Sequence, residues 1–386
     1  MFLEQVLLQS AVPLENIRVL DLCGAPGGKS TLISDILGPD NLLVANDAIR
    51  SRASILAETI TKWGSGNTMV TQSDPAAFGR LHGFFDMILV DAPCSGEGMF
   101  RAEVAVSEWS TDNTGHCAER QKRILMDIWP ALKENGILIY STCTFNPGEN
   151  EENIKWLTDR HQAECIRMDL RSFEGITEID YYGIYGYGFY PDKVRGEGLF
   201  ISVIRKKESQ EQTNIRNIRR PEMKPGKSDM EIALAWTNFS GERIIRWGEE
   251  VIAVPCDVDT YNCLFSHLKV VKAGTKISVI KKNDALPSHE LALSTRLKRV
   301  AFPVQEIELG DAISYLRRDN FSISNISKGW NVLTYHGINM GLIKNLGKRI
   351  NNYFPVEWRI RLDASAIRQA NPISWHEKPH NLKLNY

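Results

Sequence analysis

Two cysteines and one aspartate stand in polar loops that each follow an apolar run. Asp91 and Cys94 share the turn DAPC (91–94), and Cys143 lies in STCT (141–144). A thiolate can add to an electron-poor carbon as a covalent catalyst, while a nearby carboxyl group holds or donates a proton. One cysteine beside a strand is more often a small core residue, but two in turn-rich loops indicate covalent catalysis.

A glycine-rich loop, DLCGAPGGKS (21–30), joins an apolar run to an amphipathic stretch. Its glycines let the backbone approach a ligand, and the exposed amides at a helix start favour a carboxylate or phosphate. The loop is not a P-loop, because that motif needs glycine where Cys23 stands, and it does not read GxGxxG. A nucleoside cofactor with a carboxylate tail fits better than a nucleoside triphosphate.

Two further aspartates follow the next apolar runs. Asp47 ends LLVAND, from where a carboxylate can accept hydrogen bonds from both ribose hydroxyls, and Asp74 is placed to hold an adenine edge. A single aspartate there is more often a helix cap. Three at successive strand ends behind a glycine-rich turn favour cofactor binding.

These loops require a scaffold that brings strand ends together. From residue 17 to about 205, short apolar runs alternate with amphipathic stretches, which predicts an α/β fold with a parallel sheet and helices on both faces. Ligands of such sheets lie at the carboxyl ends of the strands. A polar, basic linker and a smaller β-rich region follow.

Composition excludes several classes of protein. A formal net charge of -1 gives no sign of a polyanionic partner, and seven scattered cysteines without a CxxC pair indicate neither a disulfide framework nor a metal. The sequence shows no signal peptide and no apolar run of membrane-spanning length. We therefore expect a cytoplasmic monomer without a membrane partner.

The two thiols and the carboxylate fit methylation at carbon 5 of cytosine. That carbon is a poor nucleophile, so a thiolate must add at carbon 6 while an acid holds or protonates N3. Methylation of an amino group is a rival, although Cys94 and the lack of an aromatic residue directly after Pro93 count against it. A DNA enzyme that uses Cys94 as nucleophile and an RNA-binding assembly factor without catalysis stay open.

The segments DLCGAPGGKS, VDAPCSGEGMF and STCTFNPGENEEN together resemble the Sun-type (Fmu-like) family of RNA 5-methylcytosine methyltransferases. The resemblance covers about residues 1–205. It implies a Rossmann-like methyltransferase fold with a parallel-rich sheet of seven strands. It also implies that Cys143 attacks carbon 6, that Cys94 helps to remove the carbon 5 proton, and that Asp91 binds N3 of the cytosine.

The same resemblance implies S-adenosylmethionine as the cofactor. The residues that would hold it are Cys23, Gly24, Ala25, Pro26, Gly27, Gly28, Lys29, Asp47, Arg52, Asp74 and Asp91.

The C-terminal part is similar to the tail of the bacterial F-type 16S rRNA enzymes (RsmF-like), which carry a PUA-like RNA-binding unit. The similarity rests on KGWNVLTYHGINMGLIKN and KRINNYFPVEWRIRL. It implies 16S rRNA or the small ribosomal subunit as partner, with tRNA as the alternative. Residues that could contact phosphates or stack on bases are Lys344, Lys348, Arg349, Arg359, Arg361, Tyr353, Phe354 and Trp358.

The composition along the chain and the resemblance together divide it into four parts. They are a catalytic domain (1–205), a basic linker (206–228), an intermediate domain (229–300) and a PUA-like domain (301–386). The resemblance also implies an RNA-binding segment ahead of the catalytic domain, whose last part MFLE (1–4) resembles, and we expect this chain to lack that segment.

Overall fold

The protein forms two compact units, Met1–Lys298 and Arg299–Tyr386. No helix in the described part of the chain is long and apolar enough to cross a lipid bilayer. The computed structural model describes residues 2–10, 12–13, 15–100, 106–107, 109–215, 224–282, 284–320, 323 and 326–362.

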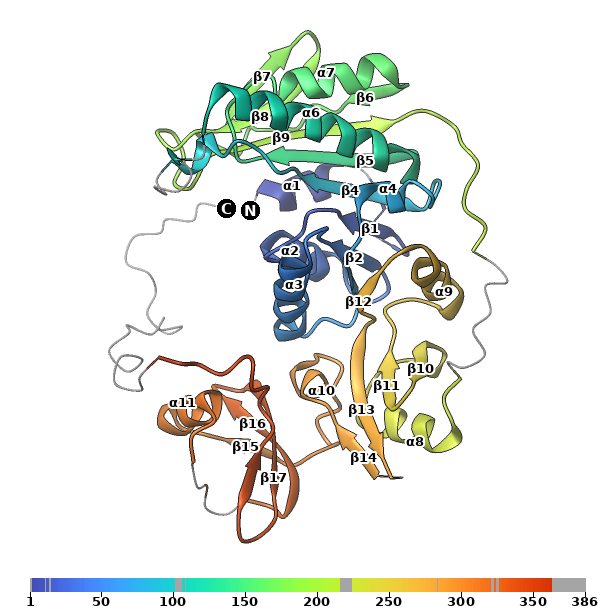
Figure 1. Ribbon diagram of the computed structural model, residues 1–386, viewed down its shortest axis with the longest axis vertical. Helices are drawn as coiled ribbons and strands as arrows, with labels where there is room; N and C mark the ends of the chain where they lie inside the picture. The colour runs from blue at the N-terminus through green and yellow to red at the C-terminus, as the bar shows by residue number, and fades with distance from the viewer. Residues whose placement is uncertain are drawn as a thin grey trace. The chain divides into compact units, whose positions relative to one another are not determined.

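Five parallel strands form the centre of the first unit, in the order β3-β2-β1-β4-β5. Figure 1 labels β2, β1, β4 and β5. Every residue of β2 and β3 is buried. Strands covered on both faces need continuous apolar sequence rather than alternation, which is why LLVA and MILV are unbroken runs. The strands are β1 (Arg18–Asp21), β2 (Leu42–Asn46), β3 (Thr68–Thr71), β4 (Phe85–Asp91) and β5 (Leu132–Thr142).

Helices cover both faces of this sheet. Successive side chains of a strand point to opposite faces, so in β1 Val19 belongs to the core cluster beneath α1 and α2, and Leu20 to the one beneath α6 and α7. Figure 1 shows α6 and α7 lying together across the sheet. The helices are α1 (Phe2–Gln9), α2 (Gly28–Leu37), α3 (Arg50–Trp63), α4 (Pro75–Phe78), α6 (Thr111–Ile128) and α7 (Glu151–Arg160).

Antiparallel strands extend the sheet at both ends to ten strands. At one end β9 pairs with β5, and β8 and β7 follow in that order. Strand β6 also pairs with β9, as a branch outside this order. At the other end β12 pairs with β3. The Rossmann-like class is confirmed, but the sheet exceeds the seven strands expected, because short edge strands owe their pairing to neighbours and carry little apolar pattern. These strands are β6 (Ala163–Cys165), β7 (Thr177–Tyr181), β8 (Ile184–Phe189), β9 (Leu199–Lys206) and β12 (Val270–Lys272).

The segment from residue 224 to Lys298 belongs to the first unit. It supplies β12 to the large sheet, and Tyr261 and Leu264 of α9 join the core cluster beneath α6. Strands β10, β11, β13 and β14 form a four-stranded sheet of their own. The elements are α8 (Lys227–Trp236), β10 (Ile244–Trp247), β11 (Glu250–Ala253), α9 (Val258–His267), β13 (Thr275–Lys281), β14 (Asp284–Pro287) and α10 (His289–Leu293). Short 3-10 turns are η1 (Glu97–Met99), η2 (Trp129–Ala131) and η4 (Gly241–Arg243).

The first residues of the expected linker are attached to the first unit. Glu208 Oε2 accepts a hydrogen bond from the indole nitrogen of Trp129 at 2.9 Å, and the amide of Thr213 donates to the carbonyl of His82 at 2.7 Å. Residues 216–223 lie outside the described residues. The division into four parts stays a prediction.

The second unit contains a four-stranded sheet in the order β15-β16-β17-β18, with β15 parallel to β16 and the other pairs antiparallel. Tyr315 and Phe354 pack with Leu333 and Ile343 in its core. The β-rich character expected of the C-terminal region is confirmed. Its elements are β15 (Val304–Glu306), α11 (Leu309–Arg317), β16 (Gly329–Tyr335), β17 (Ile338–Asn345) and β18 (Ile350–Asn352).

Candidate active site

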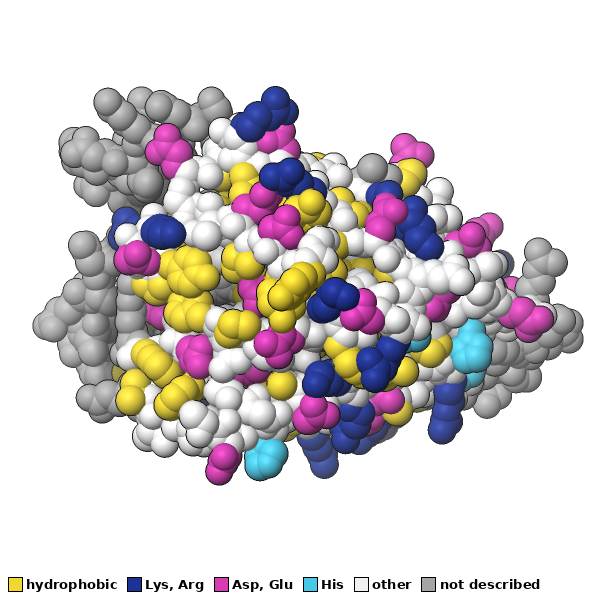
Figure 2. Space-filling view, turned by 90° about the horizontal axis from the view of Figure 1, so that it is seen from above, with side chains coloured by type: hydrophobic (Ala, Val, Ile, Leu, Met, Phe, Trp, Pro, Cys, Tyr) yellow, Lys and Arg dark blue, Asp and Glu magenta, His cyan; other side chains and the backbone are white. Residues whose placement is uncertain are grey.

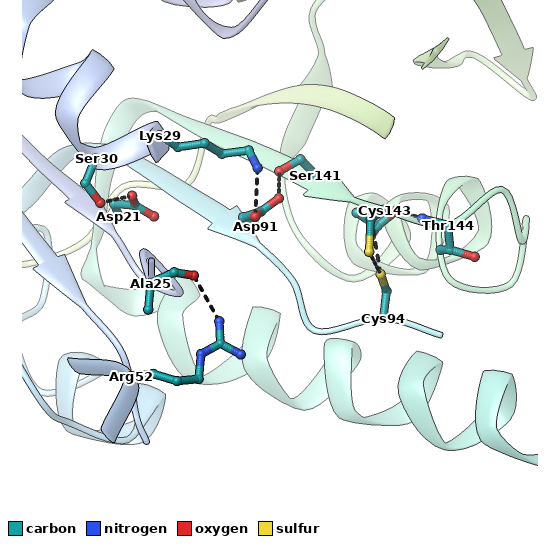
Figure 3. Close-up of polar contacts among 11 residues, drawn as sticks. Asp21, Ala25, Lys29, Ser30, Arg52, Asp91, Cys94, Ser141, Cys143 and Thr144 are labelled. Carbon is teal, nitrogen blue, oxygen red and sulfur yellow. Dashed lines mark hydrogen bonds and ion pairs between the residues drawn. The ribbon is translucent and has the colours of Figure 1, made fainter. Parts of the chain in front are cut away.

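The predicted catalytic residues meet at the carboxyl ends of β4 and β5. These two strands are parallel neighbours with Asp91 paired to Ser141, so the loops that follow them leave the sheet side by side (Figure 3). The backbone amide of Ala92 donates to the carbonyl of Ser141 at 2.8 Å, which carries the pairing into the loops. Cys94 and Cys143, which lie 49 residues apart in sequence, are thereby brought into contact.

Asp91 is fixed by two side-chain contacts. Lys29 Nζ lies 2.9 Å from Asp91 Oδ2, and Ser141 Oγ donates to Asp91 Oδ1 at 2.6 Å. The ion pair is only partly buried, with 28% and 31% of the two side chains exposed. Asp91 therefore has a set orientation and remains accessible from the strand ends.

The sulfur atoms of Cys94 and Cys143 lie 2.7 Å apart. The hydrogen bond from Cys94 lowers the pKa of the Cys143 thiol, and the same bond together with burial raises the pKa of Cys94. The backbone amide of Cys143 also donates to Cys94 Sγ at 3.2 Å. Since the thiolate is the nucleophilic form, Cys143 is the better placed nucleophile of the two.

The two loops are tied together beyond the sulfur pair. Ser95 Oγ and Thr144 Oγ1 lie 3.0 Å apart, and the amide of Gly98 donates to the carbonyl of Cys143 at 2.8 Å. Thr144 Oγ1 also donates to Glu97 Oε2 at 3.0 Å. Any shift of one loop therefore moves the other.

The glycine-rich loop follows β1 and opens α2. Gly27 has φ +119°, a conformation that glycine adopts without strain, and it stands directly before the first turn of α2. A Cβ atom at Gly24 would lie 2.7 Å from Ser30 Oγ, so the close turn also needs glycine there. Burial raises the pKa of the Cys23 thiol to about 12, so this cysteine is no nucleophile near neutral pH.

Asp47 and Arg52 brace that loop. Arg52 Nε lies 3.0 Å from Asp47 Oδ2, and Arg52 Nη2 donates to the carbonyl of Ala25 at 3.0 Å. The amide of Ile49 donates to Asp47 Oδ1 at 2.9 Å. The structure thus joins three predicted cofactor residues through direct contacts.

The comparisons with known proteins match both units. The sequence model of the family described as "16S rRNA methyltransferase RsmB/F" matches residues 8–205, and "Methyltransferase RsmF PUA domain" matches residues 302–360. The Ribosomal RNA small subunit methyltransferase F of Pectobacterium carotovorum is 35% identical over 378 residues, which cover 91% of this chain and 74% of that protein.

The chain belongs to the RsmB/F family of 16S rRNA methyltransferases. The Ribosomal RNA small subunit methyltransferase F of Pectobacterium atrosepticum is 29% identical over 371 residues, covering 91% of this chain and 74% of that protein. Among solved structures, NSun6 from Pyrococcus horikoshii with SFG is similar over 53% of this chain and 52% of that one, with 28% identity and a TM-score of 0.46.

As an RsmB/F protein, the chain is an S-adenosylmethionine-dependent rRNA methyltransferase with a PUA domain. The strand ends offer polar groups that suit this cofactor. Asp21 Oδ1 is buried and has no hydrogen-bond partner among the described residues, and a Cβ at Gly28 would meet open space. Burial raises the pKa of the Asp21 carboxyl to about 7.

Asp74 lies apart from this group of contacts. Its side chain is exposed and accepts a hydrogen bond from the amide of Ala76 at 3.1 Å, as the N-cap of α4. A capping role explains the residue fully by local structure. The predicted contact between Asp74 and adenine stays a prediction.

Three residues beside the predicted site were absent from the sequence-based set. They are Asp21, Ser30, which donates to Asp21 Oδ2 at 2.6 Å, and Ser141, which donates to Asp91. Asp21 ends an apolar strand just as Asp47 does, so the same signal could have found it. The roles of the two serines become visible only from their contacts in the folded chain.

The predicted RNA-contacting residues of the PUA domain are not equivalent. Phe354 is only 6% exposed and packs in the core, so it is unavailable for stacking on a base. Lys348 and Arg349 are exposed, and Lys344 Nζ lies 5.0 Å from the ring centroid of Trp330. The basic side chains remain candidates for phosphate contacts.

Proposed function

We propose that this chain methylates carbon 5 of a cytosine in 16S rRNA through a covalent bond between Cys143 and cytosine C6. The supporting observation is the contact of Cys143 with Cys94, which lowers the pKa of Cys143, next to the fixed carboxylate of Asp91. Family membership establishes rRNA methylation but leaves the base and the atom open. Methylation of an amino group would need no thiol, whereas carbon 5 chemistry needs a nucleophile and a proton acceptor.

In the first half of this mechanism, the Cys143 thiolate adds to C6. A bond forms between Sγ and C6, and the electron pair of the C5–C6 double bond moves to C5, which becomes nucleophilic. Asp91, held by Lys29 and Ser141, would share a proton with N3, donating it as negative charge develops on the ring. When bound, S-adenosylmethionine supplies an electrophilic methyl group.

In the second half, the ring must lose its C5 proton. Cys94 Sγ would accept this proton once its own thiol proton has passed to solvent, and the electron pair of the C5–H bond restores the double bond between C5 and C6. As this double bond forms, the bond between Sγ and C6 breaks, and its electron pair leaves on the sulfur of Cys143 as a thiolate. Cys94 Sγ, 2.7 Å from Cys143 Sγ, lies close enough to the adduct for this role.

We also propose which residues hold the other components. The loop from Cys23 to Gly28, with Lys29, Asp47, Arg52, Asp74 and Asp91, would bind the cofactor. The PUA domain would contact rRNA through its basic side chains.

The test uses tritium-labelled S-adenosylmethionine, undermethylated small-subunit rRNA and four proteins: the wild-type chain, Cys143→Ala, Cys94→Ala and, as a matched control, Cys117→Ala. Cys117 lies on α6 outside the sulfur pair. We expect 5-methylcytosine from the wild type and the control, no product from Cys143→Ala, and RNA trapped covalently on Cys94→Ala in a denaturing gel.

Other outcomes would contradict the assignment. Trapping by Cys143→Ala together with complete loss in Cys94→Ala would exchange the roles of the two thiols, as in a DNA-type enzyme. A methylated amino group in the product would refute the carbon 5 chemistry. Binding of rRNA without any methyl transfer by the wild type would support an assembly factor instead.

A further inference from the structure

A buried polar cluster lies behind the turn that carries Cys94. Tyr140, Gln121, Glu149 and Asn153 are all 0% exposed. They come from β5, α6, the loop before α7, and α7 itself. On α6 the other buried residues are Ile124, Leu125 and Ile128, so Gln121 is a polar residue in an otherwise apolar stripe.

Gln121 and Glu149 form hydrogen bonds with the backbone on both sides of Cys94. Gln121 Nε2 donates to the carbonyl of Pro93 at 2.9 Å, and the amide of Ser95 donates to Glu149 Oε2 at 3.0 Å. Gln121 Nε2 also donates to Glu149 Oε2 at 2.8 Å. The side chains of Gln121 and Glu149 therefore form one hydrogen-bonded unit, which we call the clamp. Both peptide groups next to Cys94 are therefore held by buried side chains.

The clamp is itself fixed by rigid elements. Asn153 Nδ2 donates to Gln121 Oε1 at 2.9 Å and to the carbonyl of Glu149 at 3.2 Å. Tyr140 Oη donates to the same carbonyl at 2.6 Å. A side chain held by such supporting hydrogen bonds keeps its partner in one orientation.

Stability alone does not account for this arrangement. Burying a carboxylate and an amide is unfavourable compared with apolar side chains of similar volume, and Glu149 Oε1 has no hydrogen-bond partner within the described residues. Among the described residues, the side-chain hydrogen bonds that Gln121 and Glu149 make to the backbone of the catalytic loops go to the turn of Cys94. Cys143 is held by different contacts, through Gly98.

We propose that Gln121 and Glu149 are positioning residues that hold Cys94 against Cys143 and thereby serve the release of the methylated base. The inference rests on the proposed function, in which Cys94 takes part in removing the C5 proton. Loosening the clamp would let the covalent adduct form on Cys143 while its resolution becomes slow. Neither residue needs to touch the RNA.

The first experiment compares Gln121→Met with the same substitution at Gln162, whose side chain is exposed. Methionine keeps the length and volume of Gln121 but removes both donated hydrogen bonds. At a pH where adduct formation has reached its plateau, we expect Gln121→Met to transfer the first methyl group within about threefold of the wild type. Multiple turnover should fall about 10- to 100-fold, the scale of a small misplacement of a catalytic group, with trapped RNA as in Cys94→Ala. Gln162→Met should behave as the wild type.

Substitutions of Glu149 provide a graded version of the same test. Glu149→Gln keeps one oxygen that can accept from Ser95 and Gln121, whereas Glu149→Met keeps none. We expect trapped RNA to accumulate strongly in Glu149→Met and less in Glu149→Gln. A Gln121→Met protein that melts at the wild-type temperature and turns over normally would overturn the proposal.

A second measurement reads the alignment of the thiols without catalysis. Diamide oxidises two thiols in contact to a disulfide, taking up two electrons and two protons. We expect the Cys94–Cys143 disulfide to form about 10-fold more slowly in Gln121→Met than in Gln162→Met, because misaligned sulfurs meet less often. Equal rates would refute the positioning role. If instead the rates differ but Cys94→Ala traps no RNA, the release role in the proposed function fails and the clamp stands.

Discussion

At the scale of single residues, one hydrogen bond separates the chemistry of two identical side chains. It lowers the pKa of Cys143 and raises the pKa of Cys94. The nearby charges act on Cys143 in opposite directions, since Asp91 raises its pKa and Lys29 lowers it. Because these two effects oppose each other, the hydrogen bond from Cys94 has the largest effect on the pKa of Cys143.

This reasoning predicts how the pH dependence of adduct formation shifts when Cys94 is replaced. In Cys94→Ala the donor is lost, the thiolate of Cys143 is less stabilised, and its pKa rises. A hydrogen bond to a charged group stabilises that group by about 1.5–3 kcal/mol. The acid limb of the curve of adduct formation against pH should therefore move about one to two pH units higher.

The measurement is the rate of RNA trapping against pH, with Cys94→Ser as the matched variant. Serine keeps a hydroxyl donor, so the acid limb of the Cys94→Ser curve should lie at a lower pH than that of Cys94→Ala. Identical limbs for the two variants would show that the bond from Cys94 does not control the ionisation of Cys143.

At the scale of elements, the active site depends on the close packing of two loops that follow neighbouring strands. Gly98 donates to the carbonyl of Cys143 and accepts a bond from the amide of Gly198 at 2.8 Å, so three chain segments meet at this glycine. A Cβ added there would lie 2.6 Å from Gly198 Cα and 2.8 Å from the carbonyl oxygen of Cys143. Backbone atoms cannot yield as a flexible side chain can.

We therefore expect Gly98→Ala to displace the Cys143 loop and lower kcat about 100-fold, since a shift near 1 Å at a catalytic group has effects of this size. The control is Gly115→Ala in α6, where a Cβ meets nothing within 4 Å. That variant should keep full activity and gain about 0.5–1 kcal/mol in its free energy of unfolding, because alanine favours the helix. Methyl-transfer kinetics and thermal melting of both variants decide the matter, and unchanged kcat in Gly98→Ala would contradict the packing argument.

At the scale of the whole molecule, two units with separate cores carry different parts of the function. The first holds every predicted catalytic and cofactor residue, and the second matches the PUA domain. Acidic and basic side chains are interspersed on the face shown in Figure 2, in line with a formal net charge of -1. Affinity for rRNA must therefore come from local basic groups.

Reversing the charge of Lys348 and Arg349 tests one such group. We expect the double variant Lys348→Glu/Arg349→Glu to bind rRNA about 10-fold more weakly and to lower the slope of log affinity against log salt by about two, as expected for two lost phosphate contacts. Binding of S-adenosylmethionine should not change. The matched control reverses Lys281 and Lys282, which are exposed near the turn between β13 and β14. Equal losses in both variants, measured by filter binding over a salt series, would argue against a specific contact at the PUA domain.

The sequence by itself determined the Rossmann-like class and the loops that form the site. Those features depend on short-range patterns, because buried parallel strands are continuous apolar runs and polar residues at their ends must gather at one edge. Cys94, Cys143, Asp91 and Asp47 could be selected on that ground alone. The edge strands β6 to β8 and β12 could not, since their pairing depends on distant partners.

Only the tertiary structure decided how the selected residues act on one another. The contact of Cys94 with Cys143 spans 49 residues, and the unequal pKa values of the two thiols follow from that contact rather than from the local sequence. Gln121 looks like one more polar residue on an amphipathic helix until its bonds to Pro93 and Glu149 are known. Ionisation and hydrogen bonding depend on distance and burial, and these quantities are set when the chain folds.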